Sequence, residues 1–509
     1  MCMLGALPGS KWNYTAAAHL LNRAGFGGTP SEIERLEKMG LDRAVSSFVD
    51  YENIPDPAPN PSWAKPDPDR VEKAKQAMEL RQKVRRDATQ AERKELEAKI
   101  RELLGKEIRS QAQHLVELRR WWLDRMAHGP RPLQEKLTLF WHGHFATSAQ
   151  KVRDAYLMWL QNDTFRRNAS GNWLTMLTEV TKDPAMLIWL DQTQSRKKHP
   201  NENYARGVME LFSLGEGHYT EKDVTEAARA FTGLTFDRLN QTFTYRPFIH
   251  DPETKTVLGK TGRLTYSDVL QQIVDHPQSA RFITARLWTF FAGQTPSEEL
   301  TTALAAIFRS NGNNFKPFLQ AMFRSEEFYQ PAIISNQVKS PVQWLVGSVK
   351  ILERDLPPAI FASNLLQNLG QDLFAPPNVK GWDGGLSWIT TNNLLARYNY
   401  AEMLVFGTAQ LNLGNGKGVD KGIKFLANRF NRMNSKGTPI EVQKLFTPEE
   451  RKNKTALVAA LEKRLLQSKL KPRQEQVLRE YLDSQSELDD HDILETIRLV
   501  MSTPEYQLT

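Results

Sequence analysis

The chain has 509 residues, of which 40% are hydrophobic and 25% are charged, so it can bury a large core and is expected to be globular. Its single cysteine, Cys2, excludes an intrachain disulfide framework and any zinc or iron–sulfur site built from several cysteines. The net charge of +8 is modest, and the sequence has neither a basic run with interleaved aromatics nor a long apolar segment. Nucleic-acid binding and a membrane span are therefore not predicted.

Helix start signals recur along the chain. The pattern Thr-Pro-x-Glu supplies an N-cap threonine and a proline at the first helical position. At the third helical position it supplies a glutamate, whose side chain accepts a hydrogen bond from the backbone N–H of the threonine. Its four copies begin at Thr29, Thr295, Thr438 and Thr447. They predict a mainly helical protein. Residues 13–50 are expected to form two helices, broken at Gly25–Gly28 and again near Gly40.

A charged insertion follows these N-terminal helices. Residues 54–69 are rich in proline and are expected to form an irregular or polyproline linker. Residues 70–104 are crowded with Lys, Arg, Glu, Gln and Ala and contain few apolar residues. This composition is typical of a long solvated helix or a helical hairpin, and it gives a nucleic-acid contact little support.

The main departure from helix is expected between Leu234 and Leu258. Phe243, Tyr245 and Phe248 alternate with polar neighbours, which is the pattern of a short, half-buried strand. A turn is expected at Asp251–Glu253. The sequence therefore predicts a small β-hairpin in this interval.

These signals predict a helical protein with two insertions, and they divide the chain into four parts. The predicted parts are an N-terminal helical part of the core, residues 1–53; a linker with a charged helical insertion, 54–110; a helical core carrying the candidate site and the hairpin, 111–409; and a C-terminal helical region, 410–509.

The segment from His199 to Glu221 holds the highest concentration of polar chemistry. On a helix, the side chains of Glu202, Asn203, Arg206 and Glu210 would share one arc of roughly 100°. Apolar residues take the opposite arc: Tyr204, Ala205, Val208, Leu211 and Phe212. One interpretation is a surface helix with the i,i+4 ion pairs Glu202–Arg206 and Arg206–Glu210, each worth about 0.2–0.5 kcal/mol. The other is a functional site.

A glycine turn after this helix favours the functional interpretation. Gly215 and Gly217 can adopt positive φ, so the chain can fold back and bring His218 near Glu210. Thr220 is then expected to cap the next helix, with Asp223 at the third position.

Two histidines lie in the motif Phe140–Phe145. Residues two apart on a helix point about 200° apart, so His142 and His144 can bind one metal only if Gly143 breaks the helix. His144 continues an apolar stripe and is expected to point inward, where hydrogen bonding in the core is the common role of a histidine. Combined with the acidic segment, the histidines suggest a metal site for Zn, Mn or Fe, with His142, His144, Glu210 and His218 as ligands.

A third motif covers Phe374–Gly385. Its paired prolines stiffen the chain and its glycines permit tight turns, so Trp382 is presented on a shaped loop, with Trp388 close behind. The loop is either a ligand platform or a structural plug for the core. Thr390 or Thr391 can cap the next helix, which places Asn392, Asn393 and Arg397 near its first turns.

Taken together, the motifs resemble the bacterial family catalogued as domain of unknown function 1800. The resemblance rests, in chain order, on Leu21–Gly27, Phe140–Phe145, Asn201–Asn203, Glu210–Leu211, Gly215–Val224, Ala228–Gly233, Pro376–Trp382 and Leu394–Arg397. It implies a secreted or periplasmic protein, often exported by a twin-arginine signal and often encoded beside another uncharacterised exported family, which would be its partner. No catalytic residues are established for the family. Met1 to Trp12 show no obvious export signal.

Two hypotheses of function follow. In the first, the protein is a metal-assisted hydrolytic or oxidative enzyme with Glu202 as general base and Arg206 as the group that holds a negative charge. Substrate would then contact the side chains of Asn203, Trp382, Trp388 and Arg397. In the second, the protein is an exported, non-catalytic binding or assembly protein, and the polar residues form a structural ion-pair network.

Overall fold

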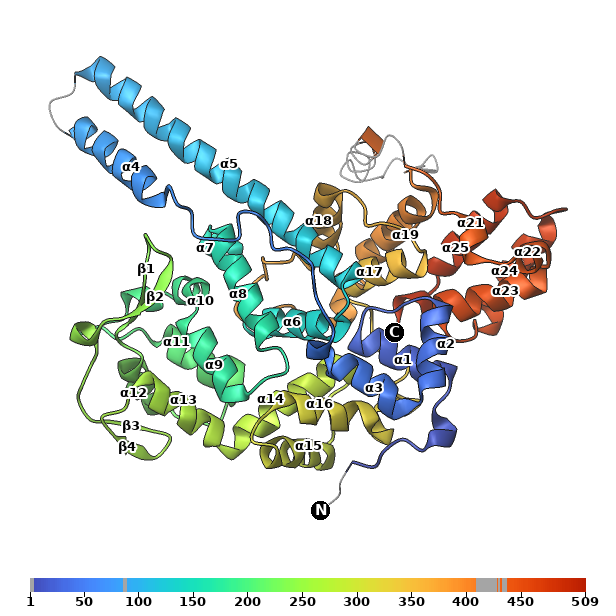
Figure 1. Ribbon diagram of the computed structural model, residues 1–509, viewed down its shortest axis with the longest axis horizontal. Coiled ribbons are helices and arrows are strands. Elements are labelled where there is room, and N and C mark those ends of the chain that lie inside the picture. The colour runs from blue at the N-terminus through green and yellow to red at the C-terminus, as the bar shows by residue number, and fades with distance from the viewer. Residues whose placement is uncertain (1–3, 86–88, 409–427, 429–430, 433–436) are drawn as a thin grey trace.

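The computed structural model describes residues 4–85, 89–408, 428, 431–432 and 437–509, so Cys2 and the beginning of the predicted C-terminal region lie outside the described residues. The described chain is mainly helical, which confirms the predicted fold class (Figure 1). None of the helices described is long and apolar enough to cross a membrane.

Three helices form the N-terminal part: α1 (Tyr14–Ala24), α2 (Pro30–Met39) and α3 (Leu41–Val49). The two predicted breaks are present and separate three helices, not two. Thr29 caps α2 through a reciprocal capping box with Glu32, as the motif predicts. Thr447 does the same for α22 (Pro448–Lys452).

The other two copies of this motif do not start helices at their threonines. Near Thr295, helix α15 (Glu298–Ser310) begins later, because Ser297 accepts the hydrogen bond of Leu300 N–H and acts as the N-cap. Near Thr438, Ile440 N–H bonds to Val405 O, and α21 (Val442–Leu445) begins only after Glu441. In both places a competing hydrogen bond displaces the predicted cap.

A helical hairpin projects from the body of the molecule (Figure 1). It consists of α4 (Arg70–Arg85) and the first half of α5 (Gln90–His128), which is one of the two forms predicted for this stretch. Residues 54–69, which precede the hairpin, form turns and irregular structure, without a helix or strand. Helix α5 continues without a break into the core, so the predicted boundary at residue 110 falls inside a helix.

The helical core packs around α6 and α17, whose side chains are buried on nearly all sides. Its helices are α6 (Pro132–His144), α7 (Ala149–Val152), α8 (Ala155–Arg167), α9 (Trp173–Lys182), α10 (Pro184–Trp189), α11 (Glu202–Arg206), α12 (Glu221–Ala230), α13 (Tyr266–Asp275), α14 (Pro277–Ala292), α15, α16 (Phe315–Arg324), α17 (Pro341–Ile351), α18 (Ala359–Asn368) and α19 (Thr391–Phe406). The C-terminal part contains α21, α22, α23 (Lys454–Leu461), α24 (Pro472–Ser484) and α25 (Asp490–Met501).

The predicted hairpin is present, but the described residues form two ribbons where one was expected. Strands β1 (Leu234–Asp237) and β2 (Thr242–Tyr245) pair antiparallel, with Leu234 opposite Tyr245. Strands β3 (Lys255–Val257) and β4 (Lys260–Gly262) form a second antiparallel pair. The first turn lies before Thr242, where Gln241 has a φ of 56°, and Asp251–Glu253 connect the two ribbons. Phe248 is 70% exposed and outside both.

Candidate functional site

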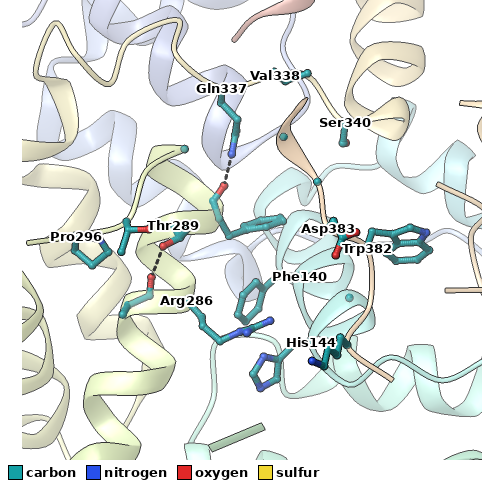
Figure 2. Close-up of a pocket in the computed structure, with 18 of the residues that line it drawn as sticks. Phe140, His144, Arg286, Thr289, Pro296, Gln337, Val338, Ser340, Trp382 and Asp383 are labelled. Carbon is teal, nitrogen blue, oxygen red and sulfur yellow. Dashed lines mark hydrogen bonds between the residues drawn. The ribbon is translucent and has the colours of Figure 1, made fainter. Parts of the chain in front are cut away.

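A cleft of about 1090 Å³ opens between α6, α14 and the loop that joins α18 to α19. Its lining draws on all three sequence motifs, since His144, Trp382 and Trp388 contribute to it, and so does His218 of the polar segment. Figure 2 shows Phe140 and His144 facing Arg286, with Trp382 and Asp383 on the other side. The cleft therefore combines aromatic rings with several cations.

Arg286 extends from α14 into this cleft (Figure 2). The side chain is exposed to the cleft, and its guanidinium lies 5.5 Å from the ring centroid of Phe282. Among the described residues it makes no hydrogen bond or ion pair. Burial lowers the pKa of Arg286, yet a guanidinium stays protonated in any protein. It is thus an uncompensated positive charge on the wall of a cavity.

The opposite wall depends on a close approach of two glycines. A Cβ atom on Gly381 would lie 2.4 Å from Gly143 O, and Gly381 has a φ of 85°. Both facts require glycine at this position. Trp382 then packs beside Gly143 and 5.5 Å from the ring of His142. The glycines of the two motifs therefore dock the tryptophan loop against the end of α6.

His142 fixes the same loop from inside the core. Its Nε2 accepts a hydrogen bond of 2.9 Å from Phe374 N–H, and Phe374 O accepts one from Ala149 N–H. Burial lowers the pKa of His142 to about 3, so the ring is neutral. Because Nε2 is an acceptor, the ring proton is on Nδ1. His142 therefore binds backbone.

His144 binds backbone on the other side of α6. Its Nε2 lies 2.9 Å from Phe212 O and must donate, because a carbonyl oxygen can only accept. Phe212 belongs to the π-helical segment Gly207–Ser213, into which α11 continues. Burial, followed by the nearby charge of Arg286, holds the pKa of His144 well below its usual value. The Nδ1 of His144 is buried and has no partner among the described residues.

The floor of the cleft carries a second cation. Lys136 is buried, and its Nζ donates to Gly25 O at 2.9 Å, to Asn22 O at 3.4 Å and to Gln343 Oε1. Burial and the neighbouring Arg23 lower the pKa of Lys136 to about 7. The three acceptor oxygens favour its protonated form. A negative ligand in the cleft would favour that form further.

The polar residues of the His199–Glu221 segment are organised on the surface. Arg206 binds Glu221 through two hydrogen bonds, at 2.9 and 2.7 Å, and lies 3.5 Å from Glu202. Glu210 accepts a bond of 2.8 Å from the hydroxyl of Tyr219. The contact with Glu202 is one of the two i,i+4 pairs that the spacing predicts. The other, Arg206–Glu210, is replaced by contacts with Glu221 and Tyr219, which follow the glycine turn. Thr220 and Asp223 form the predicted capping box of α12.

The predicted metal ligands are held apart. Helix α6 continues through Gly143, so His142 and His144 bind different segments. Glu210 is engaged by Tyr219, and His218 is exposed at the cleft edge. Within the described residues no three His, Cys, Asp or Glu side chains come together in a group able to hold a metal ion.

The four predicted substrate contacts occupy different places. Trp382 and Trp388 line the cleft, whereas Asn203 is exposed on α11 and does not. Arg397 is fully buried and donates to Lys339 O at 2.8 Å and to Gln507 Oε1 at 3.2 Å. It joins α19 to the last residues of the chain and is not at the cleft.

Sequence reasoning missed Arg286 and Lys136, the two cations that give the cleft its character. Arg286 sits in a helix with Phe282 and Phe290, and Lys136 sits in an otherwise apolar helix. A cation among apolar neighbours at helical spacing was the available signal.

The fold and the cleft define a mainly helical protein with a cavity in which cations and aromatic rings are combined, and a fold of this class does not by itself specify a function. Over residues 19–508 the sequence matches the family described as "Protein of unknown function (DUF1800)", and the chain belongs to that family. Neither a curated protein nor a solved structure matches the chain.

Proposed function

We propose that this protein binds an organic anion in the cleft between α6 and α14. The observation that carries the proposal is Arg286, a guanidinium that faces the cleft and has no acidic partner among the described residues. An unpaired guanidinium on an aromatic wall gives that wall a positive potential, which attracts a negative group. A carboxylate or phosphate from a ligand would compensate the positive charge, and a guanidinium can bind either group through two parallel hydrogen bonds.

The other charges of the cleft support an anion. Lys136 lies on the floor and Lys380 on the loop, both within the lining. Of the two acids that line the cleft, Glu298 is already engaged by Arg281 at 2.5 Å, which leaves Asp383. Arg23, fully buried behind Lys136, adds positive potential from the core side.

The aromatic rings and the size of the cleft indicate an organic molecule. Phe140, Phe282, Phe290, Trp382 and Trp388 contribute to the wall. An inorganic ion would occupy a small part of about 1090 Å³, a volume at the upper end of cavities that hold small organic ligands. A ring or acyl portion packed on the aromatic side chains, with its acid group on Arg286, would use both features.

This proposal stands closer to the binding-protein hypothesis than to the metal-assisted enzyme. The contacts of Arg206 and Glu210 support a structural role for the polar segment, and the predicted ligands do not converge. Metal-assisted catalysis remains a separate prediction, which elemental analysis of untagged protein would test. Export and a co-encoded exported partner remain expectations from the family resemblance.

Calorimetric titration of the purified chain tests the proposal. The ligands are aromatic carboxylates, sugar acids and phosphate monoesters, each compared with its uncharged amide or alcohol. At least one acid class should bind, with an affinity that falls as salt rises. Arg286→Met should weaken that binding about tenfold or more, because a charged hydrogen bond contributes about 1.5–3 kcal/mol.

Two arginines serve as controls. Arg309→Met lies at the end of α15, outside the cleft, and should leave binding unchanged. Arg281→Met lines the cleft but is paired with Glu298, so its effect should be smaller than that of Arg286→Met. If no acid class binds, or if Arg286→Met binds like the unmodified protein, the cleft is not an anion site.

A further inference from the structure

The projecting hairpin exposes apolar side chains. On α4, Val71 and Met78 are 39% and 60% exposed, and on α5, Leu104 and Ile108 are 45% and 68% exposed. No residue of α4 is buried. These side chains lie on an element that projects from the body of the molecule (Figure 1), and each of them is exposed.

Helical geometry places the four side chains on one face. The ion pair between Lys73 and Glu107, at 4.0 Å, marks the line along which the two helices meet. One residue further along, a helix has turned by about 100°. Because α4 and α5 are antiparallel, a rotation of about 100° from the contact line in the direction of the chain leads to the same face of the hairpin on both helices.

The resulting surface, which we name the arm face, contains both the apolar residues and a group of arginines. Counted from the Lys73–Glu107 pair, Val71 lies about one residue's rise from the level of Ile108 and Met78 about two from that of Leu104, so the apolar side chains form one patch. Towards the tip the same face carries charged residues: Arg81, Arg85, Glu97 and Arg101, with Arg93 at its border. None of these arginines forms an ion pair with another described residue, so the arm face has an excess of unpaired positive charge.

The opposite face of the hairpin differs in both respects. It carries Glu72, Gln76, Glu79, Lys83, Glu95, Lys99, Glu102 and Lys106, and its one exposed large apolar side chain among the described residues is Leu103, which is 37% exposed at its border with the contact line. Lys99 pairs with Glu95, and Lys106 pairs with Glu102. The hairpin is therefore amphipathic, with a self-compensated face and a face whose apolar patch and arginines are unpartnered.

We infer that the arm face docks a partner protein through an acidic amphipathic helix. An apolar stripe on such a helix would cover Val71, Met78, Leu104 and Ile108, and flanking carboxylates would reach the arginines. An anionic membrane is less suited, since residues 70–110 contain no Phe, Trp or Tyr, the residues typical of interfacial helices. A second copy is also less suited, because like-charged arginines would face one another. This inference is independent of the cleft.

The test uses the full chain and a fluorescent model peptide of about three heptads, with leucine at the a and d positions and glutamate at the flanking ones. The peptide should bind, and rising salt should weaken binding. Met78→Glu and Arg85→Glu should each weaken it at least tenfold. Gln76→Glu and Lys83→Glu, on the opposite face of the same helix, are the matched controls and should leave it unchanged.

Four results would overturn the inference. The acidic peptide does not bind; a peptide with lysine at the flanking positions binds equally well; or the variants of both faces behave alike. The fourth is that the Met78→Glu and Arg85→Glu pattern appears for vesicles containing anionic lipid, or for self-association in sedimentation, in place of the peptide. Circular dichroism of each variant checks that the hairpin remains helical.

Discussion

The polar segment Glu202–Glu221 and the wall of the cleft contain similar residue types, but they differ in whether the charged side chains have partners. In the segment, Arg206 has Glu221 and Glu202, and Glu210 has Tyr219, all near the surface. At the cleft, Arg286 has an aromatic neighbour and, within the part of the chain that the structure describes, no acidic partner. Chemical richness in a sequence is thus a weaker indicator of a binding site than a charge that the fold leaves uncompensated.

The largest effect that separates the two regions should come from pH. His19, His142 and His144 are buried, and burial lowers the pKa of each well below its ordinary value. Such a histidine is neutral in the folded protein but gains a proton in the unfolded chain once the pH falls below about 6.5. The unfolded state then binds more protons, so stability is complete above that pH and is lost as pH decreases.

Each of the three groups should contribute about 1.4 kcal/mol per pH unit below this point, until its folded-state pKa is reached. Urea unfolding at a series of pH values from neutral to mildly acidic measures the slope. A protein equally stable throughout that range would show that these histidines are charged or exposed. His144→Leu should reduce the slope by about 1.4 kcal/mol per pH unit.

The next largest effect should come from Gly381→Ala. The new Cβ would clash with Gly143 O in a backbone conformation with φ of 85°, and strain plus overpacking should cost roughly 2–5 kcal/mol. Anion binding should fall as well, because the tryptophan loop can no longer seat against α6. Thermal unfolding and calorimetry measure the two effects.

Gly217→Ala is the control from the polar segment. Gly217 also has a positive φ, of 83°, but a Cβ there would meet no atom within 4 Å. Only the backbone strain remains, about 1 kcal/mol. Equal losses for the two variants would mean that the close approach of Gly143 and Gly381 does not shape the cleft.

A smaller effect should come from His144→Leu at neutral pH. The change leaves Phe212 O without its donor, which should cost about 1–3 kcal/mol for an unsatisfied buried carbonyl. The π-helical segment should open more readily, which hydrogen exchange of residues 207–214 would detect. Unchanged exchange there would show that the segment does not depend on His144.

Much of the fold could be predicted from local sequence. Capping boxes at Thr29 and Thr447, the helical hairpin and the strands near Phe243 depend on hydrogen bonds and periodicity within a few residues. Where prediction failed, at Thr295 and Thr438, the deciding bonds came from Ser297 and from Val405 O. The first is a local competitor, and the second is distant in the chain.

The candidate site was harder to predict, because it depends on which charges find partners. Arg206 keeps the Glu202 contact that helical spacing predicts, but its closer partner is Glu221, fifteen positions away and across a glycine turn, where spacing suggested Glu210. The roles of His142 and His144 depend on the carbonyl or amide that each meets, at Phe374 and Phe212. Helical spacing places Arg286 among apolar neighbours, but the lack of an acidic partner for it depends on tertiary contacts that leave no periodic signal.

The smallest effect should come from Arg206→Ala. The side chain of Arg206 is 38% exposed and that of Glu221 is 77% exposed, so solvent screens the pair and its loss should cost less than about 1 kcal/mol. Arg229→Ala, on neighbouring α12, is the matched comparison. Arg229 is 23% exposed and holds Asp251, which is 9% exposed, so this variant should cost more, about 1–3 kcal/mol. Anion binding should be unchanged by Arg206→Ala, because Arg206 does not line the cleft. If that variant instead abolished binding while remaining folded, the polar segment would be the functional site and the contrast with the cleft would be reversed.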